Sequence, residues 1–189
     1  MVSMSERRMA EDREPWLESL KNGDEGAFRE LVKAFAGPLK RYLSGLLRDP
    51  AEAEDLTQET FLRFTQSLPD FRGDCSVRSY LYRIAHNLAL NHLASASARR
   101  EEVGDPPDGA SPSLSPQAQA LQGQRAESLR RALLSLPPQQ RAVVILKTWE
   151  DLTFREIAGV LSVAEGTAKA HYFFALRNLR GRLEASHEP

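Results

Sequence analysis

Residues 153–183 read TFREIAGVLSVAEGTAKAHYFFALRNLRGRL and contain two amphipathic runs that meet at Ser162-Val163-Ala164. Thr153 stands three residues before Glu156, which is the spacing of a capping box at a helix start. Apolar residues then recur at helical spacing in both runs. The first run carries Ile157, Ala158, Val160 and Leu161, and the second carries Ala168, Tyr172, Ala175, Leu176, Leu179 and Leu183. The stretch therefore predicts two helices joined by a tight turn.

The second run is also basic. Its charged residues lie on and around the surface that the apolar stripe leaves free, and they are Lys169, Arg177, Arg180 and Arg182 against one acid, Glu165. Two short helices, a tight turn and a basic second helix are typical of a helix-turn-helix, whose second helix enters the DNA major groove. An ordinary helical hairpin with solvated charges is the alternative. The stretch favours DNA binding without deciding it.

The composition of the whole chain narrows the class of protein. Its 189 residues, 41% of them hydrophobic, allow one domain or two small ones. The formal net charge is −1, so affinity for nucleic acid has to come from how charge is distributed along the chain. Cys75 is the single cysteine, which excludes an internal disulfide and a CxxC site, and the four histidines form no HExxH motif. We expect no metal and no cofactor.

The N-terminus and the hydropathy of the chain indicate its compartment. No apolar run approaches the roughly 20 residues that a membrane helix needs, and residues 1–14 lack the apolar segment of a signal peptide. We expect a soluble protein of a reducing compartment, the cytoplasm, with a flexible tail over residues 1–19. Met4 and Met9 are alternative starts to Met1.

A helix with two distinct faces is predicted over residues 51–68, opened by Asp49-Pro50. An earlier helix begins at Asp24 and is expected to bend or stop at Gly37-Pro38. The core face of the 51–68 helix carries Ala53, Thr57, Phe61, Phe64 and Leu68, and the opposite face carries Asp55, Glu59, Leu62 and Gln66. Five acids and no base lie between Asp49 and Glu59. A solvated face whose acids favour the helix dipole is one reading, and a protein-binding surface around Leu62 is the other.

A loop and a basic helix follow. Residues 69–78 contain Pro69 and Gly73 and are predicted to be a loop. In the helix that starts near Ser79, one face carries Tyr80, Arg83, Asn87 and Asn91. Aromatic, amide and guanidinium groups on one face suit single-stranded or distorted nucleic acid, because rings stack on bases, amides pair with base edges and arginine binds phosphate.

The composition changes at residue 101. Residues 101–119 hold four prolines, two glycines, three serines and four acids with no base, which predicts a flexible acidic linker. Helices resume before Pro137-Pro138, which start another helix. We therefore predict an all-α chain of two small helical domains joined by a flexible linker. The boundaries are 1–19 for the tail, 20–100 for the first domain, 101–120 for the linker and 121–185 for the helix-turn-helix domain.

Three of these stretches together resemble one family, the extracytoplasmic-function (ECF) sigma factors, small two-domain sigma-70 subunits of bacterial RNA polymerase. AEAEDLTQETFLRF (residues 51–64) resembles the core-binding helix of sigma region 2, and SYLYRIAHNLALNHL (residues 79–93) resembles the helix that follows it and reads the −10 element. Residues 136–180 resemble sigma region 4, which reads the −35 element. The match runs from about Ala27 to Leu183 without the linker. Three motifs in order make it far more specific than a lone helix-turn-helix.

The resemblance implies a role for each surface. The first would dock on the clamp helices of the polymerase β′ subunit and consists of Asp55, Gln58, Glu59 and Leu62. The loop from Phe71 to Val77 would capture a flipped base of the −10 element, so that recognition and melting become one event. The implied −10 residues are Phe71, Arg72, Asp74, Ser76, Arg78, Tyr80, Arg83, Asn87 and Asn91.

Region 4 would lie on the β flap with its second helix in the −35 major groove. The implied −35 residues are Glu165, Thr167, Lys169, Ala170, His171, Phe173 and Arg177. The linker would follow the path of nascent RNA. The resemblance also implies an anti-sigma factor as a partner, and it implies no enzymatic activity, because polymerase supplies the chemistry.

The chain departs from the family pattern at several positions. Tyr80 stands where tryptophan is usual, Ser162 where glycine is usual, Ala164 where an N-cap serine is usual, and His171 where arginine is usual. Losing such a cap costs about 1 kcal/mol. Phe173 and Phe174 are predicted to lie with Ala170 and Arg177 on the side away from the core stripe, where they would touch thymine methyls, the other domain or a regulator.

Two other functions remain open from the residues alone. A helix-turn-helix regulator of the response-regulator type also contains TxKxH, but it requires an α/β or ligand-binding domain upstream, where this chain has no alternating β runs. An enzyme would require a polar cluster around Cys75 or a histidine, and no histidine lies near Cys75 in the sequence. The promoter, the inducing signal and any particular anti-sigma factor cannot be predicted from these patterns.

Overall fold

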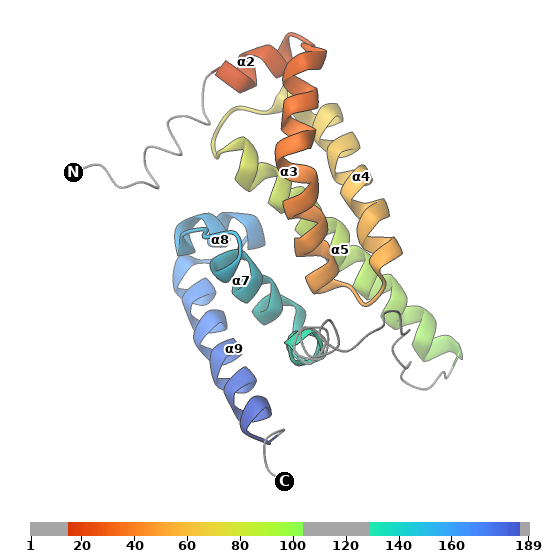
Figure 1. Ribbon diagram of the computed structural model, residues 1–189, viewed down its shortest axis with the longest axis vertical. Helices are drawn as coiled ribbons and strands as arrows, with labels where there is room; N and C mark the ends of the chain where they lie inside the picture. Colours follow the sequence, from red (N-terminus) through yellow and green to blue (C-terminus); the bar gives the residue numbers. More distant parts are fainter. Residues whose placement is uncertain (1–14, 104–128, 186–189) are drawn as a thin grey trace, which may run out of the picture.

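The computed structural model describes residues 15–103 and 129–185, and every regular element within these residues is a helix (Figure 1). The elements are α2 (Pro15–Lys21), α3 (Glu25–Leu46), α4 (Pro50–Ser67), the 3-10 helix η1 (Leu68–Asp70), α5 (Val77–Val103), α7 (Pro138–Thr148), α8 (Phe154–Leu161) and α9 (Glu165–Ala185). Residues 129–134 are also helical. The predicted all-α class is confirmed. We call α2–α5 the first helical group, and residues 129–134 with α7–α9 the second.

The first helical group begins as predicted but contains one longer helix than expected. The side chain of Asp24 caps α3 by accepting from two backbone N–H groups, Gly26 and Ala27. Of the two outcomes expected at Gly37-Pro38, a bend or a stop, the stop is wrong, because α3 continues through Pro38 to Leu46. A proline inside a helix costs about 3 kcal/mol. Burial of the residues that follow offsets this cost, since Leu39 and Tyr42 are fully buried.

Helix α4 has the two faces that the sequence predicts. Asp49 caps its start by accepting from the Ala51 N–H, and Pro50 occupies the first turn. All the residues of the expected core face are buried, and they are Ala53, Thr57, Phe61, Phe64 and Leu68. The opposite face therefore remains available to a partner.

The helix-turn-helix is confirmed in detail. Thr153 and Glu156 form the capping box at the start of α8. Ser162 ends α8 in a left-handed conformation at φ 56°, which is the conformation that glycine adopts most easily. Of the predicted α9 stripe, Ala168, Ala175 and Leu179 are buried and Tyr172 is half-buried, whereas 41% of the surface of Leu176 is exposed.

The two helical groups pack against each other instead of standing apart (Figure 1). One continuous cluster of buried residues includes Tyr42 of α3, Tyr82 of α5, Leu146 of α7 and Ile157 of α8. A smaller cluster within the second group includes Leu133 and Leu179. The flexible linker predicted from the sequence does not by itself imply that the two helical groups contact each other.

Two helices extend past the domain boundaries that the sequence predicts. Helix α2 starts at Pro15, inside the stretch assigned to the tail, and α5 continues to Val103, inside the stretch assigned to the linker. The remainder of the expected tail, residues 1–14, lies outside the described residues, as do residues 104–128.

Candidate nucleic-acid interface

The first turns of α9 present the predicted DNA-contacting positions to solvent. Ala168 is fully buried against the rest of the helix-turn-helix, so its neighbours in the sequence point outward. Glu165, Thr167, Lys169 and Ala170 are exposed, and His171 is half-buried. Backbone N–H groups and short side chains at the start of a recognition helix are the groups that reach base edges. The geometry suits entry of α9 into a major groove.

Aromatic rings extend this surface along α9. Phe173 and Phe174 are 66% and 54% exposed, which confirms that they lie away from the core stripe. Tyr172 joins them to α8: its ring centroid lies 5.5 Å from Phe154 and 6.2 Å from Phe173, both edge to face. Phe173 is thereby supported from below by a packed ring. Arg177 is exposed one turn further along.

The basic charge at the start of α9 is paired within the free protein. Lys169 Nζ lies 2.7 Å from Glu165 Oε1, one turn earlier, and both side chains are about half exposed. Such an exposed pair contributes little stability, in the range of about 0.3–0.5 kcal/mol. Lys169 can therefore exchange the carboxylate for a DNA phosphate at small cost.

A stacked aromatic pair forms the centre of the predicted −10 site. The Phe71 and Tyr80 rings stack with centroids 4.6 Å apart and an interplanar angle of 25°. The Arg83 guanidinium lies 4.9 Å from the centroid of the Tyr80 ring. Phe71 is buried while Tyr80 is half-buried, so Phe71 supports the platform and Tyr80 presents it. Stacking of this kind suits an unpaired base.

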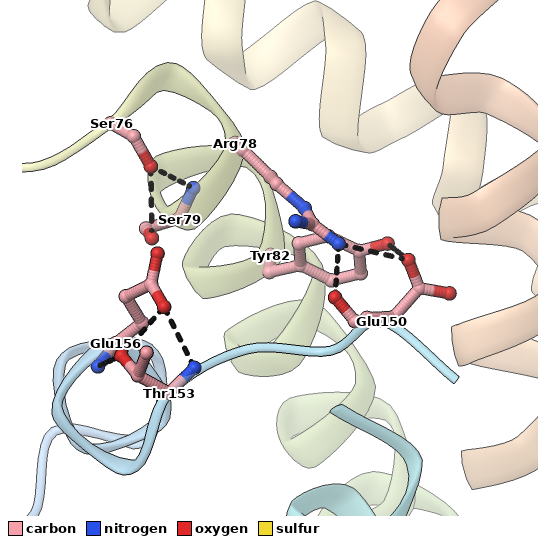
Figure 2. Close-up of polar contacts among 7 residues, drawn as sticks. All are labelled: Ser76, Arg78, Ser79, Tyr82, Glu150, Thr153 and Glu156. Carbon is pink, nitrogen blue, oxygen red and sulfur yellow. Dashed lines mark hydrogen bonds and ion pairs between the residues drawn. The ribbon is translucent and has the colours of Figure 1, made fainter. Parts of the chain in front are cut away.

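The other predicted −10 residues divide into exposed positions and a buried cap. Arg72, Asp74, Asn87 and Asn91 are exposed. Ser76 is buried, where its Oγ accepts from the Ser79 N–H at 3.1 Å and donates to Ser79 Oγ at 3.0 Å (Figure 2). Ser76 thus caps the start of α5. This contact leaves its hydroxyl turned toward the helix and away from the surface.

Arg78 lies apart from the other predicted −10 residues. It shares a face of α5 with Tyr82, at i and i+4, whereas Tyr80 and Asn87 lie on the opposite side of the helix. Figure 2 shows Arg78 and Tyr82 both directed at Glu150, in the loop after α7. Arg78 Nη2 lies 3.5 Å from Glu150 Oε2 and donates to the Glu150 carbonyl, and the Tyr82 hydroxyl donates to Oε2. Burial, together with the Glu150 carboxylate, raises the pKa of Tyr82.

The predicted protein-docking face of α4 is open to solvent. Asp55 and Gln58 are exposed, and Leu62 is 53% exposed. Glu59 is half-buried and accepts from Arg63 Nε at 2.7 Å. A leucine surrounded by acids and an amide on an exposed face is suited to a basic, partly apolar partner surface.

Two residues that join the helical groups were missed by the sequence analysis. Besides Glu150, these include Arg141 of α7, which is buried and donates to the carbonyl oxygens of Leu46, Leu134 and Leu136. Burial and the nearby Arg48 lower the pKa of Arg141 to about 10. The sequence did hold a signal for the burial of Arg141. This arginine directly precedes the apolar run 142–146, and the run leaves the helix no solvent-exposed side there.

The described part of the chain offers no cluster of three or more His, Cys, Asp or Glu side chains able to hold a metal ion. Among the same residues, no helix is both long enough and apolar enough to cross a membrane.

Each of the two helical groups matches a known protein family model. Residues 31–99 match the model of sigma-70 region 2, and residues 126–179 match that of sigma-70 region 4. The RNA polymerase sigma-H factor of Pseudomonas aeruginosa is 31% identical over 176 residues, which cover 84% of this chain and 87% of that relative. The ECF sigma factor SigW of Bacillus subtilis is 25% identical, with 88% and 94% covered. The chain therefore belongs to the sigma-70 family of RNA polymerase sigma factors, in the ECF group.

Solved structures share the fold. A structure described as CnrH in complex with the cytosolic domain of CnrY matches with a TM-score of 0.70 at 22% identity, covering 92% of this chain and 97% of that one. A structure of the sigma factor RpoE of Bartonella quintana with the anti-sigma factor NepR matches with a TM-score of 0.65, also at 22% identity, covering 83% and 96%.

The family membership settles the general function. The protein is an alternative sigma factor that directs transcription initiation, and its first and second helical groups are regions 2 and 4. A response-regulator type of transcription factor is not favoured, because region 2 occupies the place of the α/β domain that such a protein needs. Sigma factors are non-catalytic initiation factors that bind DNA.

Proposed function

We propose that this chain binds core RNA polymerase through α4, holds the −10 element through the Phe71–Tyr80 platform, and reads the −35 element through α9. The observation that carries the proposal is the exposure of the start of α9. Thr167, Lys169 and Ala170 are exposed around the buried Ala168, on the helix that directly follows the turn after α8. A hairpin that only fills a core does not need this exposed face.

The −10 assignment rests on Tyr80, Arg83, Asn87 and Asn91, with Arg72 and Asp74 on the loop. Tyr80 offers a ring for a flipped base, and Arg83 beside it offers a cation for the adjoining phosphate. Asn87 and Asn91 continue this surface along α5 and are exposed. Phe71 and Ser76 support the site from beneath it.

The docking assignment rests on Asp55, Gln58, Glu59 and Leu62, and the proposed acceptor is the clamp helices of the β′ subunit. Region 4 is proposed to bind the β flap. An anti-sigma factor is a proposed regulator, because one of the similar folds was solved with the anti-sigma factor NepR. The proposed place of action is the cytoplasm, where polymerase works, and no catalytic group is assigned.

The domain boundaries also belong to this proposal. We assign residues 20–100 to the unit that binds core and the −10 element and residues 121–185 to the −35 unit, with residues 101–120 as the linker. The match to region 2 over residues 31–99 and the match to region 4 over residues 126–179 support these limits.

Transcription from a reconstituted holoenzyme tests the proposal. The purified chain is combined with core polymerase and sheared genomic DNA of its source bacterium, and the RNA 5′ ends are mapped. We expect transcripts that depend on the chain and that share two upstream elements at a constant spacing. Core polymerase alone is the control. A chain that neither binds core nor adds any transcript is not a sigma factor of this kind.

A further inference from the structure

The aromatic pair on α9 includes one ring, Phe174, to which the proposed function gives no role. We propose that Phe174 contacts the 5-methyl group of a thymine in the −35 element, and that this contact makes α9 selective for a T·A pair at that step of the promoter. The inference rests on the proposed function, because it presumes that α9 lies in the −35 major groove. It goes further by naming the base that one side chain selects.

Phe174 lies in one row with outward residues at the start of α9. Ala168 and Ala175 are fully buried, so they mark the side of α9 that faces the core. Successive residues of an α-helix are turned by about 100° around its axis, which places Ala170 and Phe174 one above the other, with Thr167 a turn earlier. All three residues are exposed. At a rise of about 1.5 Å per residue, Phe174 lies about 6 Å beyond Ala170 along the axis, which is roughly two base-pair steps of B-DNA.

Both rings of the pair stay exposed although the two helical groups are packed together. Phe173 and Phe174 are 66% and 54% exposed. Helix α7 contacts both α3 and α9 and lies between them (Figure 1). The first helical group therefore does not cover the pair, and packing between the domains does not account for it.

The charge around the rings favours DNA as the partner. Phe173 lies four residues after Lys169 and four before Arg177, so it stands between two cations in one row of the helix. Residues 166–183 contain four bases and no acid. The pair is also continuous with the exposed positions at the start of α9. A surface that combines two rings with this charge suits an acidic polymer that carries apolar groups on its edges.

The chemistry of the phenyl ring selects thymine among the bases. The major-groove edges of guanine, adenine and cytosine present hydrogen-bond donors and acceptors, whereas thymine adds a 5-methyl group beside its O4 acceptor. A phenyl ring forms no hydrogen bond, so over a G·C pair it would take polar atoms away from water without replacing their bonds. Over a T·A pair the ring covers an apolar group. Phe174 therefore favours thymine through the methyl contact.

Replacing single thymines with deoxyuridine tests the contact, because deoxyuridine lacks only the 5-methyl group. The probe is a fluorescent promoter duplex that contains the −35 and −10 elements mapped with the wild-type holoenzyme. One −35 thymine, on either strand, is replaced at a time, and holoenzyme binding is measured by anisotropy. We expect wild-type binding to weaken about fourfold at one thymine or more, as for one buried methyl group. With Phe174→Ala, thymine and uracil at one of these positions should bind equally well.

Leu176→Ala is the matched control. Leu176 is an apolar side chain on the same helix with 41% of its surface exposed, and it is turned about 200° from Phe174. Its loss should leave the uracil effect at full size. Circular dichroism and binding to core polymerase check that both variants fold and form holoenzyme. Phe174→Gln, which also favours a helix, should lose the uracil effect too and serves if Phe174→Ala forms no holoenzyme.

Two results overturn the inference while leaving the proposed function intact. A wild-type holoenzyme that binds thymine and uracil equally at every −35 position, or a −35 element of G·C pairs alone, would show that α9 contacts no methyl group. A uracil effect of unchanged size in Phe174→Ala would assign the contact to another residue and leave Phe174 to a protein partner such as a regulator. Undiminished binding after the whole −35 element is scrambled would instead refute the proposed function, because α9 would then not read that element.

Discussion

Replacing Arg141 with methionine should destabilise the protein by about 3 kcal/mol. The Arg141 guanidinium donates to three backbone carbonyls, Leu46 in region 2 and Leu134 and Leu136 in region 4. Hydrogen bonds from a charged group contribute about 1.5–3 kcal/mol each. Against their sum stands a desolvation cost of several kcal/mol for the buried charge, which leaves the net figure near 3 kcal/mol. Methionine keeps most of the side-chain volume, so the loss reports the hydrogen bonds and not a cavity.

The measurement is thermal and urea unfolding of the free chain at pH 7, followed by far-ultraviolet circular dichroism. A loss of about 3 kcal/mol lowers the midpoint temperature by roughly 6–12 °C for a chain of this size. Arg141→Lys should lose about half as much, because an ammonium group cannot donate as a planar fork. Arg155→Met on the exposed surface of α8 is the control and should change stability by less than about 0.5 kcal/mol. An Arg141→Met variant as stable as this control would refute the reasoning.

Three further predictions concern binding and pH. Asp55→Ala combined with Glu59→Ala should weaken binding to core polymerase, measured by fluorescence anisotropy, while leaving the melting curve unchanged; undiminished affinity would remove α4 as the docking face. Lys169→Ala combined with Arg177→Ala should make the salt dependence of −35 DNA binding shallower by about two units of the log–log slope, and a slope equal to that of the wild type would place both residues off the DNA. Burial lowers the pKa of His86 to about 4, against the opposing effect of a hydrogen bond with Gln139, so on acidification the unfolded chain takes up this proton before the folded protein does. Stability should be complete above pH 6.5 and should fall by about 3 kcal/mol as the pH drops toward 4. His86→Gln should flatten this profile in urea unfolding; an unchanged profile in His86→Gln would exclude His86 as its source.

The helix-turn-helix and the two faces of α4 could be predicted from the sequence because their causes are local. The capping box of Thr153 with Glu156 and the caps at Asp24 and Asp49 each depend on residues within one turn. Apolar spacing within a single helix likewise identifies its buried side. These signals do not depend on how the helices are arranged.

The course of α3 and the placement of Arg78 depend on contacts far apart in the sequence. Proline at position 38 indicates a break locally, but the fully buried Leu39 and Tyr42 hold the helix together. Glu150 lies 72 residues from Arg78, and no local pattern pairs them. The sequence did indicate that Arg78 lies on a different face from the other predicted −10 residues, since a helical wheel places it with Tyr82 and opposite Asn87. The family resemblance grouped Arg78 with the DNA-binding residues, whereas the structure gives it an intramolecular partner.

The close approach of Gly45 to Ile145 has a genetic consequence. A selection for loss of sigma activity should recover substitutions at Gly45 of α3, far from the proposed DNA-contacting residues, because a side chain there meets Ile145 of the neighbouring helix α7. The atom nearest to a new Cβ at position 45 is the terminal methyl Cδ1 of Ile145. Ile145→Val removes only that methyl group. Ile145→Val is therefore the second-site suppressor that we expect for a small substitution such as Gly45→Ala. Such suppression would show by genetics alone that α3 of region 2 contacts α7 of region 4.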